Sequence, residues 1–316
     1  MAKKRRKSIT QQIMSDAVKE LNKHQHDLTR QQYIRDFKRY VLYCRQLHNV
    51  KTLEECKAYV QEYIDHLTYE RQLSASTIHT YLASICSVYN INLSMYSKPI
   101  RHCAEYTRGR KTMLYPDSSQ DFFCMENKRL YLFQKAVGIR RNELRNLRCN
   151  DFVLDESGYP CVRVRSGKGG KKTLVRIKNE DISLVKSYFD GSNEKVFGKN
   201  EMDNHLNLHS LRASSARSYY FYLLYKVNHE PGFHEQLEKE VRLRWKLYNI
   251  DKKTGNPKPF DEKLITGDYL FKGKNRELAI SKGRPIKMDK LCLLATSMFR
   301  LSHFRLNVAA VSYMLA

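Results

Sequence analysis

Between residues 29 and 95, apolar side chains recur every three or four residues in three successive stretches, which is the spacing of one face of an α-helix. Thr52 and Glu55 have the spacing of a capping box at the start of the second stretch. Ser76 is a candidate N-cap for the third. The pattern predicts three amphipathic helices that form an all-helical domain over residues 21–100. In the first stretch the apolar positions are Tyr33, Phe37, Tyr40, Val41, Cys44 and Leu47.

Two basic, weakly periodic segments flank this predicted domain. Residues 1–20 are polar and basic, and we interpret them as a tail or as an arm that contacts DNA; a nuclear localisation signal is a further alternative. Residues 101–118 contain Pro116 and the basic run 108–111, which predicts a linker.

The remaining residues, 119–316, mix helical and strand patterns. A helical pattern ends at Val137, and Gly138 is typical of the residue after a helix C-terminus. Residues 161–165 and 173–177 alternate and are β-branched, and the glycine-rich run between them predicts a hairpin turn. A further helix is expected from about His209 to Leu224. The predicted fold is mainly α with a small antiparallel β-sheet.

The charge of the chain changes this picture from a plain helical protein to one that binds a polyanion. Lys and Arg total 57 against 33 Asp and Glu, a formal net charge of +24. The commonest polyanionic partner is a nucleic-acid backbone, and an acidic membrane surface is the other one. No stretch approaches the roughly 20 apolar residues of a membrane helix, and no apolar run follows the basic N-terminus as in a secretory signal.

The cysteines point to neither a metal nor a disulfide framework. None of the eight lies in a C-x-x-C pair, and no Cys/His cluster has the spacing of a zinc site. We expect scattered reduced thiols in a cytosolic protein, most of them buried as small core side chains.

Two segments contain basic residues suited to phosphate chemistry. Arg140 follows a predicted helix end at Gly138, so its guanidinium lies on a tight turn where it can make two hydrogen bonds to a phosphate. Lys168 lies between glycines in the predicted hairpin turn, where it can donate a proton. Considered alone, each is more often a solvated side chain on a loop.

Two further segments contain His, Arg and Tyr. His209 and Arg212 are three residues apart and share a helix face, although chance alone explains one such pair in this composition. His303 precedes Tyr313 in a predicted terminal amphipathic helix. Because the chain has 21 tyrosines, core packing is the ordinary interpretation of Tyr313.

Taken together, the order of these residues resembles the catalytic signature of the tyrosine recombinase (phage integrase) family, in which Arg, Lys, His-x-x-Arg, His or Trp, and Tyr follow one another. Residues 138–144 fit a G-[LI]-R-x-x-E-L motif, a register that selects Arg140 rather than Arg141. Residues 167–169 fit a G-K-G turn, and residues 209–212 fit H-x-L-R. Residues 301–308 fit L-x-H-x-R-x-x-V, with Tyr313 ten residues after His303. Residues 73–82 also resemble part of the helical core-binding domain of that family.

The resemblance implies a site-specific DNA recombinase that breaks and rejoins DNA through a 3′-phosphotyrosine, without metal, ATP or another cofactor. It implies Tyr313 as nucleophile and Arg140 and Arg212 as ligands of the scissile phosphate. Lys168 is then the general acid, His209 a base or hydrogen-bond partner, and His303 a residue that orients the phosphate. The implied partners are double-stranded DNA, three further copies in a synaptic homo-tetramer and an accessory protein, with no membrane. The implied setting is a bacterial mobile element, in the cytoplasm and associated with the nucleoid.

Two features depart from the pattern of the family. Arg212 and Tyr313 are 101 positions apart, more than in compact relatives, which predicts an insertion at about residues 225–287. We interpret this segment either as a surface for partner or DNA contacts or as a long solvated excursion. Only three residues follow Tyr313, so docking of a C-terminal segment on a neighbouring protomer is expected to be absent or to use another element.

Two other functions remain open at this point. A type IB topoisomerase uses the same kinds of residue, although the helical N-terminal domain favours a recombinase. A DNA-binding regulator without catalysis would use Tyr313 only as a core side chain, and it would keep its function after Tyr313→Phe.

Overall fold

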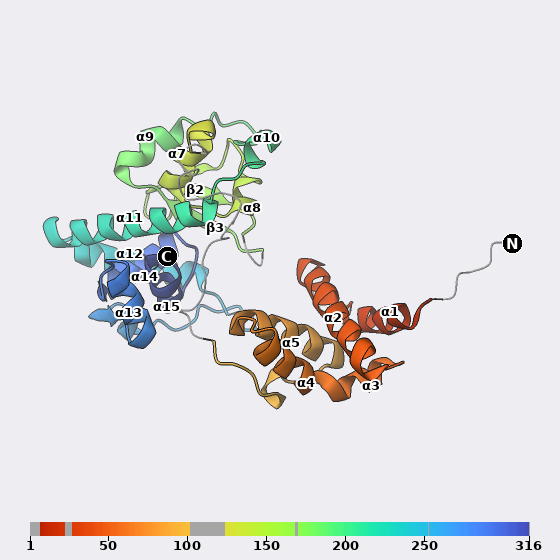
Figure 1. The fold of residues 1–316 in the computed structure, drawn as a ribbon. Helices are drawn as coiled ribbons and strands as arrows, with labels where there is room; N and C mark the ends of the chain where they lie inside the picture. The colour runs from red at the N-terminus through yellow and green to blue at the C-terminus, as the bar shows by residue number, and fades with distance from the viewer. Residues whose placement is uncertain (1–6, 23–26, 102–123, 168–169, 252, 316) are drawn as a thin grey trace. The chain divides into compact units, whose positions relative to one another are not determined.

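The computed structural model of the chain describes residues 7–22, 27–101, 124–167, 170–251 and 253–315 (Figure 1). The chain divides into two compact units, Met1–Tyr106 and Thr107–Ala316. The catalytic site expected from the sequence falls in the second unit, and each unit is described by itself below.

The first unit is helical. Its α-helices are α1 (Ile9–Leu21), α2 (Asp27–His48), α3 (Leu53–Cys56), α4 (Val60–Asp65) and α5 (Ala75–Tyr89). Short 3-10 or π-helical turns cover Lys57–Tyr59, His66–Glu70 and Leu93–Met95. Helices α1 and α5 pack against α2, and the three expected amphipathic stretches supply most of the core between them.

The helix α1 differs from the tail expected over residues 1–20. Ser8 caps it by accepting a hydrogen bond from Gln11 N, and Gln11 returns a bond to the backbone of Ser8. Ile13, Ala17 and Leu21, spaced four apart, are buried. Residues 9–20 are therefore part of the helical unit, because this narrow apolar stripe packs against the other helices despite the polar composition around it.

The capping residues differ in detail from those expected. Thr52 accepts from Glu55 N, as in a capping box, but the Glu55 carboxylate accepts from the preceding Lys51 N. The N-cap of α5 is Ser74 rather than Ser76, and its hydroxyl accepts from Thr77 N. Both helices begin where the sequence indicates, within a turn.

The second unit is mainly α with small antiparallel sheets. Its helices are α7 (Lys128–Val137), α8 (Arg141–Leu144), α9 (Ile182–Lys186), α10 (Lys199–Met202), α11 (Leu208–His229), α12 (Phe233–Tyr248), α13 (Gly273–Ser281), α14 (Lys290–Phe299) and α15 (Leu306–Ala309). Short 3-10 turns cover Asn179–Asp181 and Glu262–Leu264, and a π-helical turn covers Ala310–Met314. The strands are β1 (Phe152–Leu154), β2 (Pro160–Val164), β3 (Thr173–Arg176), β4 (Asp268–Leu270) and β5 (Lys287–Asp289).

The expected hairpin is confirmed as part of a larger sheet. Strands β2 and β3 pair antiparallel with Val162 opposite Val175, and β1 extends the sheet beyond β2. A second, two-stranded sheet joins β4 to β5. The fold class predicted from the sequence, mainly α with a small antiparallel sheet, is confirmed.

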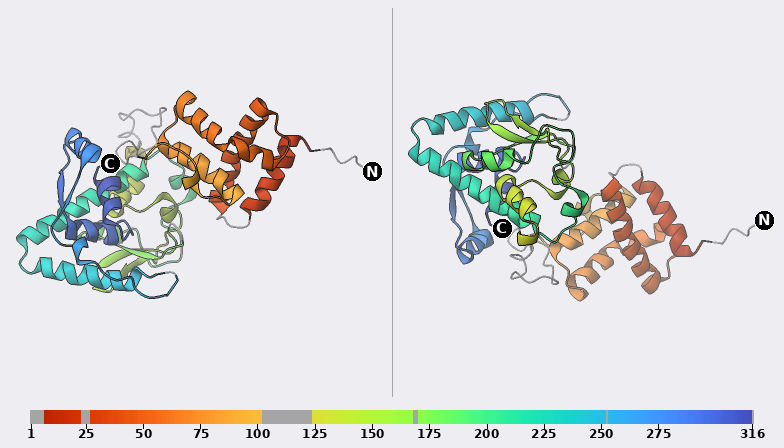
Figure 2. Two further views of the ribbon diagram at one scale, coloured as in Figure 1. Left: turned by 90° about the horizontal axis from the view of Figure 1, so that it is seen from below. Right: turned by 90° about the horizontal axis from the view of Figure 1, so that it is seen from above.

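Helix α11 runs between two apolar cores (Figures 1 and 2). One core lies among α7, α8, α9, α10 and the three-stranded sheet. The other lies among α12, α14, α15 and the C-terminal turn. Because α11 contacts both α7 and α14, it fixes the two halves of this unit against each other.

The segment 225–287 is not a solvated excursion. It forms α12, β4 and α13, and it buries apolar side chains in the second core: Phe233, Leu237, Val241, Trp245, Ile265, Phe271 and Ala279. The charged residues that dominate its sequence therefore surround an apolar stripe, as on any helix that covers a core.

Two further expectations concern cysteines and membranes. All cysteines among the described residues are free thiols, and six of them are buried. Within the same residues, every helix is too short or too polar to cross a membrane.

Candidate active site

The turn that holds Arg140 is set by a glycine and a carboxylate. Helix α7 ends at Gly138, whose φ of 70° is left-handed, and the chain is extended again at Arg140 before α8 begins. Glu143, in the first turn of α8, accepts from Arg140 N at 2.7 Å and from Arg140 Nη1 at 2.6 Å. These two bonds fix both the backbone and the guanidinium of Arg140.

Substitution of Gly138 tests how closely α7 and α11 approach at this turn. A Cβ atom at Gly138 would lie 2.7 Å from Ser215 Oγ on α11, in addition to the cost of the left-handed φ. We expect Gly138→Ala to lower the free energy of unfolding by about 2–4 kcal/mol, measured by urea denaturation. Gly158→Ala is the matched control, because Gly158 has a φ of 80° and no atom within 4 Å of its added Cβ. Equal losses in the two variants would contradict the close approach.

Arg212 is buried on α11 and connects the two turns on either side of it. Its Nη1 donates to Gly138 O at 2.7 Å and its Nη2 donates to Leu301 O at 2.9 Å. Glu143 Oε2 lies 3.7 Å from the same Nη1. Burial lowers the pKa of Arg212, and the charge of Arg140 lowers it further. A guanidinium keeps its charge in such a place, because its ordinary pKa is above 12.

His303 faces Arg140 across the site. Its Nε2 lies 3.2 Å from Arg140 Nη2, and since a guanidinium only donates, Nε2 accepts and the ring proton is on Nδ1. The backbone is fixed as well, because His303 N donates to Ser297 O and Ser297 Oγ donates back to His303 O. Burial lowers the pKa of His303 to about 3, together with the charges of Arg140, Arg212, Arg305 and Lys171.

The lowered pKa of His303 predicts a pH dependence of stability. His303 has an ordinary pKa of 6.5 and a folded value of about 3, so between these values the unfolded chain binds more protons. The stability contributed by neutral His303 is present above about pH 6.5 and is lost as the pH falls toward 3. We expect the unaltered protein to lose about 1–2 kcal/mol more than His303→Gln between pH 7.5 and pH 5 in urea unfolding. Identical losses would mean that His303 titrates normally in the folded chain.

Tyr313 lies in the π-helical turn that follows α15, and its side chain is 6% exposed. Its ring centre is 5.9 Å from that of His209 and 6.2 Å from that of His303, and the Arg212 guanidinium carbon lies 5.7 Å from it. Arg217 Nη1 donates to Tyr313 O at 3.0 Å, which fixes the backbone. The exposed His209 and the buried Arg212 therefore both lie beside the phenol ring, as their spacing on α11 requires.

Lys168 lies outside the described residues, but the base of its turn is described. Gly167 N donates to Lys171 O at 2.7 Å. A Cβ atom at Gly167 would lie 3.0 Å from Glu143 Oε1, so the turn begins beside the carboxylate that holds Arg140. Thr173 Oγ1, at the start of β3, donates to Ser302 Oγ next to His303 at 3.1 Å.

Sequence reasoning missed several residues that position this site. Gln134, buried on α7, donates to Ile139 O at 2.7 Å and to Leu208 O at 2.9 Å, so it connects the turn of Arg140 to the start of α11. Arg300 is fully buried and donates to Arg176 O, Ala136 O and Ser215 Oγ. A Gln or Arg in an amphipathic helix gives no signal of such burial, whereas Glu143 stood in the recognised motif.

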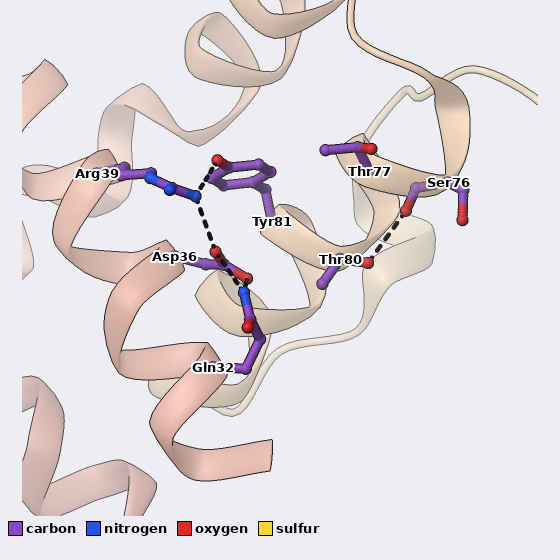
Figure 3. A pocket seen from close by; sticks show the side chains of 7 residues that line it. All are labelled: Gln32, Asp36, Arg39, Ser76, Thr77, Thr80 and Tyr81. Atoms are coloured by element: carbon purple, nitrogen blue, oxygen red, sulfur yellow. Dashed lines mark hydrogen bonds and ion pairs between the residues drawn. The ribbon is translucent and has the colours of Figure 1, made fainter. Parts of the chain in front are cut away.

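The first unit has a polar hollow of about 220 Å³ between α2 and α5 (Figure 3). Its acidic side chain, Asp36, accepts two hydrogen bonds from Gln32 and one from Arg39. Arg39 also donates to Tyr81 OH at 2.5 Å. The hydroxyls of Ser76 and Thr77 line the other side, in the first turn of α5. The hollow thus presents an exposed guanidinium and the Ser76 hydroxyl at a helix N-terminus, groups that suit an anion, while the Thr77 hydroxyl is hydrogen-bonded to that of Ser74 at 2.9 Å.

Comparisons with known proteins found a curated relative and a solved structure with recombinase names. No protein-family model matches the chain. A curated relative, "Tyrosine recombinase" from Thermosipho africanus, is 27% identical over 203 residues, which cover 59% of this chain and 69% of that protein. A solved structure described as XerA recombinase is 20% identical over 66% of this chain and 84% of its own, with a TM-score of 0.23, and so low a score carries no inference. The ordered motifs, the approach of four of their residues to one another and the curated relative together show that this chain is similar to tyrosine recombinases.

Proposed function

We propose that the protein is a site-specific DNA recombinase that cuts and rejoins DNA through a covalent link between Tyr313 and a 3′ phosphate. The observation that carries the proposal is the meeting of Arg140, Arg212, His303 and Tyr313 at one point. Their contacts with one another span 3.2 to 6.2 Å, although they come from three separate parts of the sequence.

The proposed cleavage exchanges one phosphate ester for another. The Tyr313 oxygen forms a bond to phosphorus, the bond from phosphorus to the 5′ oxygen breaks, and the phenol proton passes to His209 or through it to water. Lys168 gives a proton to the departing 5′ oxygen. The ester energy is kept in the protein–DNA link, so rejoining needs no ATP, and the step uses no metal.

The two arginines are proposed to stabilise the charge that develops on the non-bridging oxygens. Their guanidinium groups are fixed before substrate arrives, by Glu143 for Arg140 and by two backbone carbonyls for Arg212. Preorganised donors of this kind need no rearrangement during the reaction. Neutral His303 has a proton on Nδ1 and accepts at Nε2, so its proposed role is to orient Arg140 and the phosphate.

Double-stranded DNA is the proposed partner. The net charge of +24 supports phosphate contact by both units. In the first unit, Arg39 and the hydroxyls of Ser76 and Thr77 are proposed phosphate contacts. A homo-tetramer that joins two duplexes, an accessory protein and a mobile element in a bacterial cell are proposed from the resemblance to the family.

Trapping of a covalent intermediate tests the proposal. The protein is incubated with nicked suicide duplexes made from the DNA that flanks its own coding sequence, then denatured and examined for protein attached to DNA. Trypsin digestion of the adduct should give a nucleotide-bearing peptide that begins after Arg305 and contains Tyr313. Binding without an adduct would favour a non-catalytic regulator, and relaxation of supercoiled DNA without site preference would favour a topoisomerase.

A further inference from the structure

The buried face of α12 carries a group of ion pairs that the proposed chemistry does not use. α12 lies in the segment 225–287, where no family motif was recognised. Two of its side chains, Glu240 and Arg244, are buried although both are ionisable. Figure 2 shows α12 beside the strands of the three-stranded sheet in both views. Because burial of a charge costs free energy unless the charge is paired, their partners indicate what the helix holds.

The ionic partners belong to the turn after β1 and to β3, and Gln236 on α12 itself also donates to Glu240 at 3.0 Å. Arg244 Nη2 lies 2.8 Å from Asp155 Oδ2, its Nε donates to Glu156, and its Nη1 donates to Leu174 O on β3 at 3.0 Å. Glu240 accepts from Arg176, the last residue of β3. Arg244 thus connects the turn after β1 to the backbone of β3.

The sheet side of this group is internally paired as well. Arg176 Nε lies 2.5 Å from Asp155 Oδ2. Burial opposes both charges, yet Arg176 lowers the pKa of Asp155, and Tyr219, Glu240 and Asp155 raise that of Arg176. Asp155 and Arg176 are therefore charged at neutral pH, and loss of a partner leaves an uncompensated buried charge.

Strand β3, which Glu240 and Arg244 contact, leads directly to the reacting groups. β3 begins at Thr173, which bonds Ser302 beside His303. The turn before β3 begins at Gly167, against the Glu143 carboxylate, and Lys168 is the next residue in the chain. A displacement of β3 along or away from the sheet therefore moves the base of the turn that carries the proposed general acid.

We propose that α12 is a positioning element of the active site, in which Glu240 and Arg244 hold β3 and thereby fix Gly167 and Lys171, the two described ends of the turn in which the proposed general acid stands in the sequence. The inference rests on the proposed function and adds a role for the inserted segment. Both side chains are too buried to contact DNA themselves, so they act through the strand. Misplacement of a reacting group by about 1 Å costs about 100-fold in rate.

A substrate that needs no general acid tests this role. In a 5′-bridging phosphorothiolate duplex, cleavage breaks a phosphorus–sulfur bond and releases a thiolate, which leaves without a proton because thiols have a pKa of about 8.5. We expect Glu240→Gln and Arg244→Lys to slow single-turnover cleavage of the ordinary duplex about tenfold or more. On the phosphorothiolate duplex we expect both to stay within about twofold of the unaltered protein. For each protein, cleavage of the ordinary and of the phosphorothiolate duplex is measured on the same preparation. The ratio of these two cleavage rates therefore does not depend on the fraction of protein that is folded.

Arg242→Ala is the matched control. Arg242 lies on the same helix but is more exposed, and it pairs with Glu238 and Glu262 rather than with the sheet. Its ratio of rates should equal that of the unaltered protein. Equal slowing of Glu240→Gln and Arg244→Lys on both duplexes, or no slowing, would overturn the positioning role and leave the proposed function intact.

Amide hydrogen exchange separates this inference from the proposed chemistry. Without DNA, the amides of residues 174–176 should exchange faster in Glu240→Gln and Arg244→Lys than in Arg242→Ala, and unchanged exchange would overturn the bracing of β3. If the unaltered protein forms no adduct with either duplex, the proposed function falls and the positioning role falls with it. If Lys168→Met forms adduct equally well on both duplexes, the assignment of Lys168 as general acid is overturned. The role given to α12 is then overturned as well.

Discussion

Tyr313→Phe is expected to abolish the covalent protein–DNA adduct while leaving DNA binding within about twofold of the unaltered protein. The substitution removes one oxygen and keeps the ring, which is packed in the second core against the His209 and His303 rings. The phenol oxygen is the proposed nucleophile, and a phenyl ring has none. Adduct is measured on the suicide duplex by denaturing electrophoresis, and binding by titration at a fixed salt concentration.

The control for Tyr313→Phe is a second buried tyrosine of the same core. Tyr219, on α11, is 2% exposed and belongs to the same apolar cluster. Tyr219→Phe should form adduct at the rate of the unaltered protein. An adduct that persists in Tyr313→Phe would assign the nucleophile to another side chain, and loss in both variants would attribute the effect to core packing.

The sequence predicts the regular helices and the hairpin of the scaffold, and it names a candidate site whose residues stay a prediction. Apolar periodicity locates α7, α11 and the β2–β3 hairpin, because each of these buries one regular face. The site followed from the order of motifs, since Arg140, Arg212 and His303 are each ordinary residues on their own. Their approach to one another depends on the crossing of α11 between two cores, and a local pattern contains no information about that crossing.

Charged residues that are buried account for most of what the sequence could not predict. Arg244, Glu240 and Arg300 lie in stretches that resemble solvated helix faces, yet each is buried with several partners. Such pairing joins residues 64 to 164 positions apart, so neither composition nor spacing signals it. The same reason left the role of α12 open, because its charges gave no sign that they face the sheet rather than solvent.

Arg212→Lys and Arg140→Lys are expected to slow cleavage to a similar extent and to differ in stability. Each lysine keeps the charge but offers no planar fork, and loss of one such donor to a transition state costs about 100- to 1000-fold in rate. Arg212 is 2% exposed and donates to two backbone carbonyls that a lysine cannot reach together. We therefore expect Arg212→Lys to lower the free energy of unfolding by about 2–4 kcal/mol.

Arg140→Lys supplies the comparison, because the side chain of Arg140 is 26% exposed and a lysine keeps a positive charge beside the Glu143 carboxylate. We expect it to change the free energy of unfolding by less than about 1 kcal/mol. Single-turnover cleavage and urea unfolding of both variants measure the two effects separately. Slow cleavage with unchanged stability in Arg212→Lys would contradict its role in joining the Gly138 and Leu301 turns. Fast cleavage in Arg140→Lys would remove Arg140 from the proposed phosphate site, and stabilisation of the transition state would then be assigned to Arg212.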